Sequence, residues 1–167
     1  ERASAYLGGV GMKGSHGIGS SEKSYVPFAW AGVNNLAQQV QGGTGSYVNL
    51  DKEALLKLNP EVMFIDGSGT ELIRQDYGKN PDFYKALRAV SSGRVYTLYP
   101  YNMYTTNIDT ALADAYAVGK VLYPKQFADV DIAAKANSIY QFLVGKPVYQ
   151  QMEKDFGALG KKVVFGQ

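Results

Sequence analysis

The segment YVNLDKEALLKLNPEVMFID, residues 47–66, places a predicted helix directly before a predicted buried strand. Asp51 is suited to cap the helix, and Glu53 falls in the first turn, where the helix dipole favours a carboxylate. Asn59-Pro60 ends the helix, because a residue that precedes proline avoids helical backbone. The apolar run 62–65 then reads as a strand covered on both faces, as in a parallel sheet. The leucines expected to face the core are Leu55, Leu56 and Leu58.

The rest of the chain continues this alternation of strands and helices. Strands are also predicted over 5–10 and 94–98. The first of them is followed by a glycine- and serine-rich loop over 11–24, here called the glycine-rich segment. The predicted helices cover 27–37, 51–58, 80–93, 109–122, 130–144 and 147–157, with Trp30 and Leu112 among the expected core residues. This order predicts a single α/β domain over 1–167, a three-layer sandwich with a mainly parallel sheet flanked by helices.

The composition narrows the class of protein. With 167 residues and 46% apolar content, the chain is large enough to enclose a core. A net charge of +2 without a run of like charges argues against nucleic-acid binding. The absence of cysteine excludes thiolate metal sites, and a single histidine leaves little for a histidine-built site, so we expect no resident metal. No apolar run is long enough to predict a membrane-spanning helix.

The residues after predicted strands are candidates for ligand binding, because ligands of open α/β sheets meet the loops at the carboxyl ends of the strands. The tyrosine loop, residues 99–104, follows the strand 94–98 and combines apolar rings with polar tips. The alternative is that its tyrosines cover the helix that begins near Asp109. Asn107 or Asp109 is expected to cap that helix. The candidates in this loop are Tyr99, Tyr101, Asn102 and Tyr104.

The glycine-rich segment contains KGSHGIGS, residues 13–20, which follows the first predicted strand. Lys13 and His16 are candidates to face an anionic ligand there, although a lone histidine is more commonly an ordinary surface residue. The segment lacks the Walker and dinucleotide-binding glycine patterns, and no nucleophile elbow follows a strand, so it gives no sign of a phosphate loop or a hydrolase. Asp66 is interpreted as a cap or turn acid.

The segment 47–66, the motif GRVYTL at 93–98 and the paired C-terminal helices together resemble the C-terminal lobe of a family of substrate-binding proteins. That family feeds ABC importers for iron-siderophore, haem, cobalamin and related metal complexes. The resemblance implies a two-lobed receptor whose N-terminal lobe is absent from 1–167, with residues 1–3 ending the helix that joins the lobes. It also implies that Glu53 docks on an arginine of the permease and that Tyr47 lines the ligand cleft.

The resemblance therefore predicts an extracytoplasmic solute-binding component, not an enzyme, that delivers a metal complex to an ABC permease. We expect it to be periplasmic or membrane-anchored as a lipoprotein, with membrane contact only through the permease or a lipid anchor outside this chain, and with no cofactor. Three alternatives remain: an oxyanion-binding protein of the same family for molybdate or tungstate, a lobe of a metallocluster oxidoreductase, and a domain that binds polyanions or a protein through the glycine-rich segment.

Overall fold

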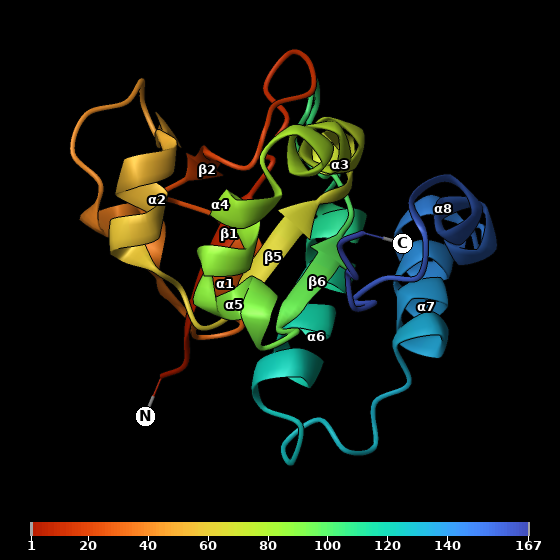
Figure 1. The fold of residues 1–167 in the computed structure, drawn as a ribbon. Coiled ribbons are helices and arrows are strands. Elements are labelled where there is room, and N and C mark those ends of the chain that lie inside the picture. Colours follow the sequence, from red (N-terminus) through yellow and green to blue (C-terminus); the bar gives the residue numbers. More distant parts are fainter. Residues whose placement is uncertain (1, 167) are drawn as a thin grey trace.

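A parallel sheet runs through the centre of the computed structural model, which describes residues 2–166 (Figure 1). Within that range the sheet has four strands in the order β3-β1-β5-β6, and all three pairings are parallel. A separate antiparallel pair joins β2 to β4. The strands are β1 (Ser4–Gly8), β2 (Ser20–Glu22), β3 (Asn34–Asn35), β4 (Tyr47–Asn49), β5 (Met63–Asp66) and β6 (Val95–Leu98).

Helices cover both faces of the sheet, so the predicted three-layer α/β sandwich is confirmed. Side chains alternate along each strand. Leu7 and Phe64 enter the core beneath α1 and α6, whereas Tyr6 and Met63 enter the core beneath α2 to α5. The helices are α1 (Val26–Trp30), α2 (Lys52–Leu58), α3 (Thr70–Lys79), α4 (Pro81–Ala86), α5 (Arg88–Ser91), α6 (Ile108–Leu122), α7 (Ile132–Val144) and α8 (Tyr149–Phe156), with short 3-10 turns η1 (Leu36–Gln39) and η2 (Gly67–Gly69).

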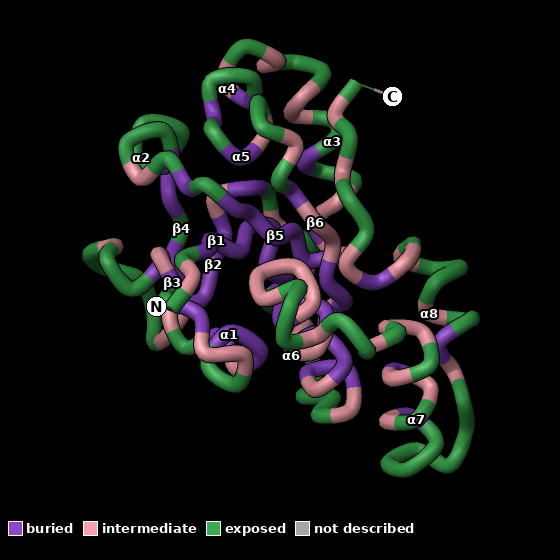
Figure 2. The backbone as a smooth tube through the Cα atoms, turned by 90° about the horizontal axis from the view of Figure 1, so that it is seen from below, coloured by how far each residue is buried: buried purple, intermediate pink, exposed green. Residues whose placement is uncertain are grey.

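Burial is greatest in the sheet and in α6 and declines toward α7 and α8 (Figure 2). The helix α6 lies between the sheet and α7, and its small residues, such as Ala111 and Ala117, are completely buried. The outer end of α7 is exposed, and Phe142 there retains 88% of its accessible surface. None of the helices in residues 2–166 combines the length and apolar character needed to cross a membrane.

The segment 47–66 forms the predicted helix and strand. The Asp51 carboxylate accepts a hydrogen bond from the Ala54 N–H at 2.8 Å, and Asn59 ends α2 in left-handed backbone conformation with φ of 40°. The strand β5 is buried throughout. The prediction that three leucines of α2 face the core was wrong in part: Leu55 is fully buried, but Leu56 is 37% exposed, because α2 contacts the domain along one side only.

The predicted helix over 27–37 was wrong beyond its first turn. The helix α1 ends at Trp30 because Gly32 takes a φ of +70° and turns the chain into β3. The Asn35 side chain then accepts a hydrogen bond from the Ala37 N–H at 3.0 Å and starts η1. The prediction that Trp30 and Leu112 belong to the core was also wrong, since Trp30 is 51% exposed and Leu112 is half-buried.

Several elements were absent from the sequence prediction. The strand β2 lies within the glycine-rich segment, β4 precedes α2, and α3 occupies residues for which we expected no helix. The predicted helix over 80–93 divides into α4 and α5 at Leu87, whose backbone is extended. Arg2 and Ala3 are not helical, so the predicted helix end over 1–3 is wrong for those two residues, and residue 1 lies outside the described range.

The C-terminal strap, residues 160–165, lies along β6 at the edge of the sheet. The Val163 N–H of the strap donates a hydrogen bond to Val95 O at 2.9 Å. The Lys161 carbonyl of the strap accepts one from the Thr97 N–H at 3.0 Å. The Phe165 ring packs against Tyr77 and Tyr84, with centroids 5.2 and 5.3 Å away. The strap therefore pairs an edge strand that would otherwise present free hydrogen-bonding groups to solvent.

Candidate ligand-binding cleft

Three loops meet at the carboxyl ends of β1, β5 and β6. The glycine-rich segment follows β1, the turn η2 follows β5, and the tyrosine loop follows β6. The Lys13 N–H donates to Met103 O at 3.0 Å, which joins the first loop to the third. A Cβ added at Gly69 would lie 2.6 Å from backbone atoms of Gly9 and His16, so only glycine lets η2 approach the glycine-rich segment this closely.

A hollow of about 270 Å³ opens beside these loops, between the glycine-rich segment and β4. The His16 Nε2 atom lies 3.1 Å from Met12 O, a contact that holds the imidazole at the rim. The antiparallel pairing of Glu22 with Tyr47 brings β4 to the glycine-rich segment. The hollow is lined by Met12, His16, Ser20, Gly43, Thr44, Tyr47, Val48 and Asn49.

Tyr47 connects the hollow to the tyrosine loop. Its hydroxyl accepts a hydrogen bond of 3.4 Å from Asn102 Nδ2, and Asn102 Oδ1 in turn accepts from the Thr106 hydroxyl at 2.8 Å. Partial burial, together with the nearby carboxyls of Glu22 and Asp66, raises the pKa of Tyr47, which keeps its hydroxyl protonated at neutral pH. The tyrosine therefore presents a neutral hydroxyl and an apolar ring to the cleft.

Three buried acids lie beneath the cleft: Glu22, Asp66 and Asp114. Asp66 Oδ1 accepts hydrogen bonds from the Ser68 N–H at 2.9 Å and from the Ser68 hydroxyl, which confirms its predicted role as a cap. Asp114 accepts from the Tyr99 N–H at 2.9 Å. Burial raises the pKa of Glu22, raises that of Asp66 to about 6, and raises that of Asp114 well above its usual range.

These acids have no buried cation beside them, since the ion pairs within residues 2–166 involve Asp76, Glu71 and Glu61 instead. Within the same range, no three acidic or histidine side chains converge in a way that could hold a metal ion. The lining of the hollow itself contains no carboxyl group, and burial of the three acids near it raises their pKa because it disfavours the charged forms.

Replacing Asp66 with asparagine is expected to stabilise the protein at pH 7.5 by roughly 1–3 kcal/mol. Burial raises the pKa of Asp66 in the folded protein to about 6, from 3.8 in the unfolded chain. The folded protein therefore binds this proton more tightly, and stability falls as the pH rises from about 4 through 6. Asparagine removes that pH dependence and keeps an oxygen that accepts from Ser68. Urea unfolding at pH 4.5 and pH 7.5 measures the difference.

Asp129→Asn serves as the control, because Asp129 is exposed beyond the end of α6. We expect this variant to follow the wild-type protein at both pH values. An Asp66→Asn variant that loses as much stability as wild type between pH 4.5 and pH 7.5 would show that Asp66 is not the titrating group.

Solved structures of periplasmic binding proteins share this arrangement of strands and helices. MolA of Haemophilus influenzae, a molybdate-binding protein solved with molybdate, gives a TM-score of 0.63 at 21% identity, covering 89% of this chain and 42% of MolA. FepB of Veillonella parvula, described as TroA-like, gives 0.60 at 20% identity, covering 98% of this chain and 47% of FepB. CeuE of Helicobacter pylori, solved with Ni(II), gives 0.62 at 17% identity, covering 91% and 48%.

The chain shares the fold of these binding proteins. It spans less than half the length of each of the three. The descriptions of MolA and of a solute-binding protein from Sulfurospirillum deleyianum place those two proteins in ABC transport systems. No family model matches the sequence, and no curated protein matches it either.

In this binding-protein fold, the residues predicted from sequence separate into two groups. Tyr47 and His16 line the same hollow, and Asn102 contacts Tyr47. Lys13 is exposed near them and uses its backbone to bind the tyrosine loop. Tyr104 is 74% exposed at the tip of that loop. These five residues lie on the side of the domain where the parallel strands have their carboxyl ends.

Tyr99 and Tyr101, which the sequence suggested as ligand-binding candidates, are instead buried in the core. The Tyr99 hydroxyl donates to Gly157 O at 2.8 Å, under the end of α8. The Tyr101 ring packs at 5.6 Å from Tyr25. Both rings therefore belong to the core on the α1 and α6 side of the sheet.

Glu53 lies on the first turn of α2 and is exposed, as predicted. It follows β4 by four residues, and Asn49 at the end of β4 lines the hollow. Within residues 2–166 Glu53 forms no ion pair. Its carboxylate is therefore exposed and unpaired within this range.

Glu22 was not among the residues predicted from the sequence. Its side chain is 6% exposed and accepts a hydrogen bond from the Ser46 hydroxyl at 3.2 Å. Ser20, Ser21 and Glu22 are all polar and all buried, so the segment shows no alternation of apolar and polar residues that would mark a strand. A three-residue strand inside a glycine-rich segment gives too little periodicity to be recognised.

Proposed function

We propose that this chain is the C-terminal lobe of an extracytoplasmic solute-binding protein that captures a metal complex and delivers it to an ABC permease. The observation that carries the proposal is the hollow at the carboxyl edge of the sheet, where Tyr47 and His16 lie together beside Asn102. The ligand classes we favour are iron-siderophore, haem and corrinoid complexes. The fold shared with periplasmic binding proteins supports this assignment.

The remaining part of the binding site belongs, in this proposal, to a second lobe that faces the hollow. The hollow is a shallow depression of about 270 Å³, near the lower limit of typical small-molecule sites. Tyr104, exposed for 74% of its surface, would then contact ligand or the opposite lobe. This chain covers less than half of each of the binding proteins that share its fold, which supports the proposal of a second lobe.

The charges near the cleft favour a metal complex over a bare oxyanion, and among such complexes they favour one without net negative charge. Glu22 and Asp66 lie close enough to Tyr47 to raise the pKa of its hydroxyl. A molybdate or tungstate anion at the Tyr47 hydroxyl would be repelled by any charged form of these acids. Lys13 is the cation of the glycine-rich segment nearest to the tyrosine loop, and its side chain is exposed to screening water. We therefore rank the oxyanion function second.

Glu53→Arg in the two-lobed receptor is expected to reduce transport by at least about tenfold while leaving ligand affinity unchanged, because opposite charges at an interface mainly set orientation and association rate. In the proposal, Glu53 accepts the guanidinium of a permease arginine. Its place on a short, capped helix fixes the carboxylate in space. Uptake of labelled ligand into proteoliposomes that contain the permease measures transport, and calorimetry measures affinity.

Glu153→Arg is the matched control, because Glu153 is an exposed glutamate on α8 and does not line the hollow. It should transport at the wild-type rate. Equal transport by Glu53→Arg and Glu153→Arg would remove the docking role, and a loss of ligand affinity in Glu53→Arg would assign Glu53 to the binding site instead.

A further inference from the structure

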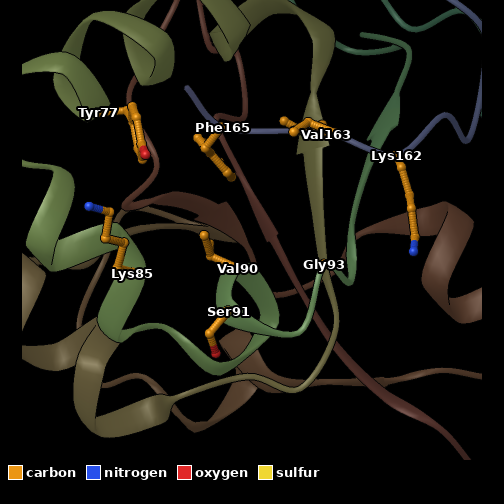
Figure 3. Close-up of a pocket in the computed structure, with 9 residues that line it drawn as sticks. Tyr77, Lys85, Val90, Ser91, Gly93, Lys162, Val163 and Phe165 are labelled. Carbon is orange, nitrogen blue, oxygen red and sulfur yellow. The ribbon is translucent and has the colours of Figure 1, made fainter. Parts of the chain in front are cut away.

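A second hollow, of about 390 Å³, lies between the C-terminal strap and the helices α3 to α5 (Figure 3). Gly93 lines it just before β6 begins, so it lies at the amino end of that strand, whereas the cleft lies at the carboxyl ends. The two hollows share no lining residue. The second hollow is lined by Tyr77, Lys85, Val90, Ser91, Gly93, Lys162, Val163, Val164 and Phe165.

The floor of this hollow is apolar and partly open to water. The rings of Tyr77 and Phe165 lie 5.2 Å apart and tilted by 31°, and both rings are only half-buried. Val90 and Val163 are half-buried beside them, and Val164 is 57% exposed. A bound apolar ligand removes from water the apolar surface that these side chains still expose. This removal is favourable and supplies a driving force for binding.

Two lysines flank this floor. In Figure 3, Lys85 of α4 and Lys162 of the strap lie on opposite sides of Val90 and Phe165. Among the described residues neither lysine forms an ion pair, and the lining contains no carboxylate. An isolated exposed lysine is unremarkable, but two free ammonium groups on separate elements beside one apolar surface match an anion with an apolar body.

We propose that this hollow binds a small organic anion, a carboxylate or sulfonate attached to an apolar chain or ring. The apolar part packs on Val90, Val163 and Phe165, and the anionic group pairs with Lys85 or Lys162. The volume is within the range of small-molecule sites, roughly 300–1,000 Å³. This site is separate from the cleft and does not depend on the function proposed above.

Titration of the 167-residue chain with decanoate, below its micelle concentration, tests the proposal. Backbone amide shifts in a ¹H–¹⁵N correlation spectrum locate the binding, and we expect saturable shifts at Gly93 and Val163. The Lys85→Gln/Lys162→Gln variant should bind decanoate at least about tenfold more weakly, because neither lysine remains to form the charge-assisted contact with the carboxylate. Decanol, which has the same chain without the charge, should bind this variant and the wild type equally.

The control is Lys125→Gln/Lys146→Gln, which removes the same net charge from two exposed lysines outside the hollow. It should bind decanoate as the wild type does. Decanoate that binds the two double variants with equal affinity, or that shifts residues elsewhere and leaves Gly93 and Val163 unmoved, would overturn the proposal. A Val164→Asp variant gives a second test, because a carboxylate introduced at this exposed position should repel decanoate and spare decanol.

Discussion

Phe64→Ala is expected to destabilise the domain by about 3–5 kcal/mol, the usual cost of deleting a fully buried phenylalanine ring. Phe64 is 0% exposed at the centre of β5, and its ring lies 5.6 Å from that of Phe28 and 5.9 Å from that of Tyr96. Both neighbouring strands of the sheet fix the backbone of β5, so the sheet cannot close over the space that the ring leaves. Urea unfolding at constant pH measures the change.

Phe142→Ala is the matched control, since it deletes the same ring from a side chain that is 88% exposed on α7. Its effect should stay within about 0.5 kcal/mol. If the two variants lost equal stability, β5 would not be the packed centre of the core.

The isolated chain is expected to bind a metal complex at least about 100-fold more weakly than the two-lobed receptor, because small-molecule sites normally enclose roughly 70–90% of the ligand surface. The hollow beside Tyr47 and His16 contacts a ligand from one side. We expect the isolated chain to fold, because the sheet and both helical layers lie within residues 2–166. Calorimetry with a ferric trihydroxamate complex compares the affinities of the chain and the receptor.

Molybdate is the comparison ligand in the same experiment. The acids beneath Tyr47 lead us to expect that the receptor binds the uncharged ferric complex in preference to molybdate. Equal affinities of the chain and the receptor for the ferric complex would place the whole site within these 167 residues. Preferential binding of molybdate would reverse the ranking of the two ligand classes.

The sequence by itself determined the elements whose signals are local. In the segment 47–66, the cap at Asp51, the stop at Asn59-Pro60 and the apolar run of β5 each act within a few residues, and each was predicted correctly. The strand β6 and the helices α6 and α7 were recognised for the same reason. The alternation of these elements was enough to predict the three-layer α/β class. The proposed function came from the resemblance of the sequence to a known family.

The sequence also indicated where a site would form, because loops at the carboxyl ends of parallel strands lie at one edge of a sheet. It could not show which loop residues reach the surface. Tyr99, Tyr101 and Tyr104 have the same chemistry, yet the first two are buried and the third is 74% exposed. The difference arises from how the chain turns after β6 and packs beneath α8 and against Tyr25, contacts between residues far apart in the sequence.

Only the tertiary structure decided the features that depend on such distant contacts. The short strands β2 and β4 exist because they pair with one another, and that pairing buries Glu22 beside Tyr47. The C-terminal strap gains its structure from β6, and the hollow between Lys85 and Lys162 arises only where the strap meets α4. Local sequence encodes caps, breaks and periodicity, whereas the burial of an acid or the opening of a hollow depends on which segments the complete fold brings together.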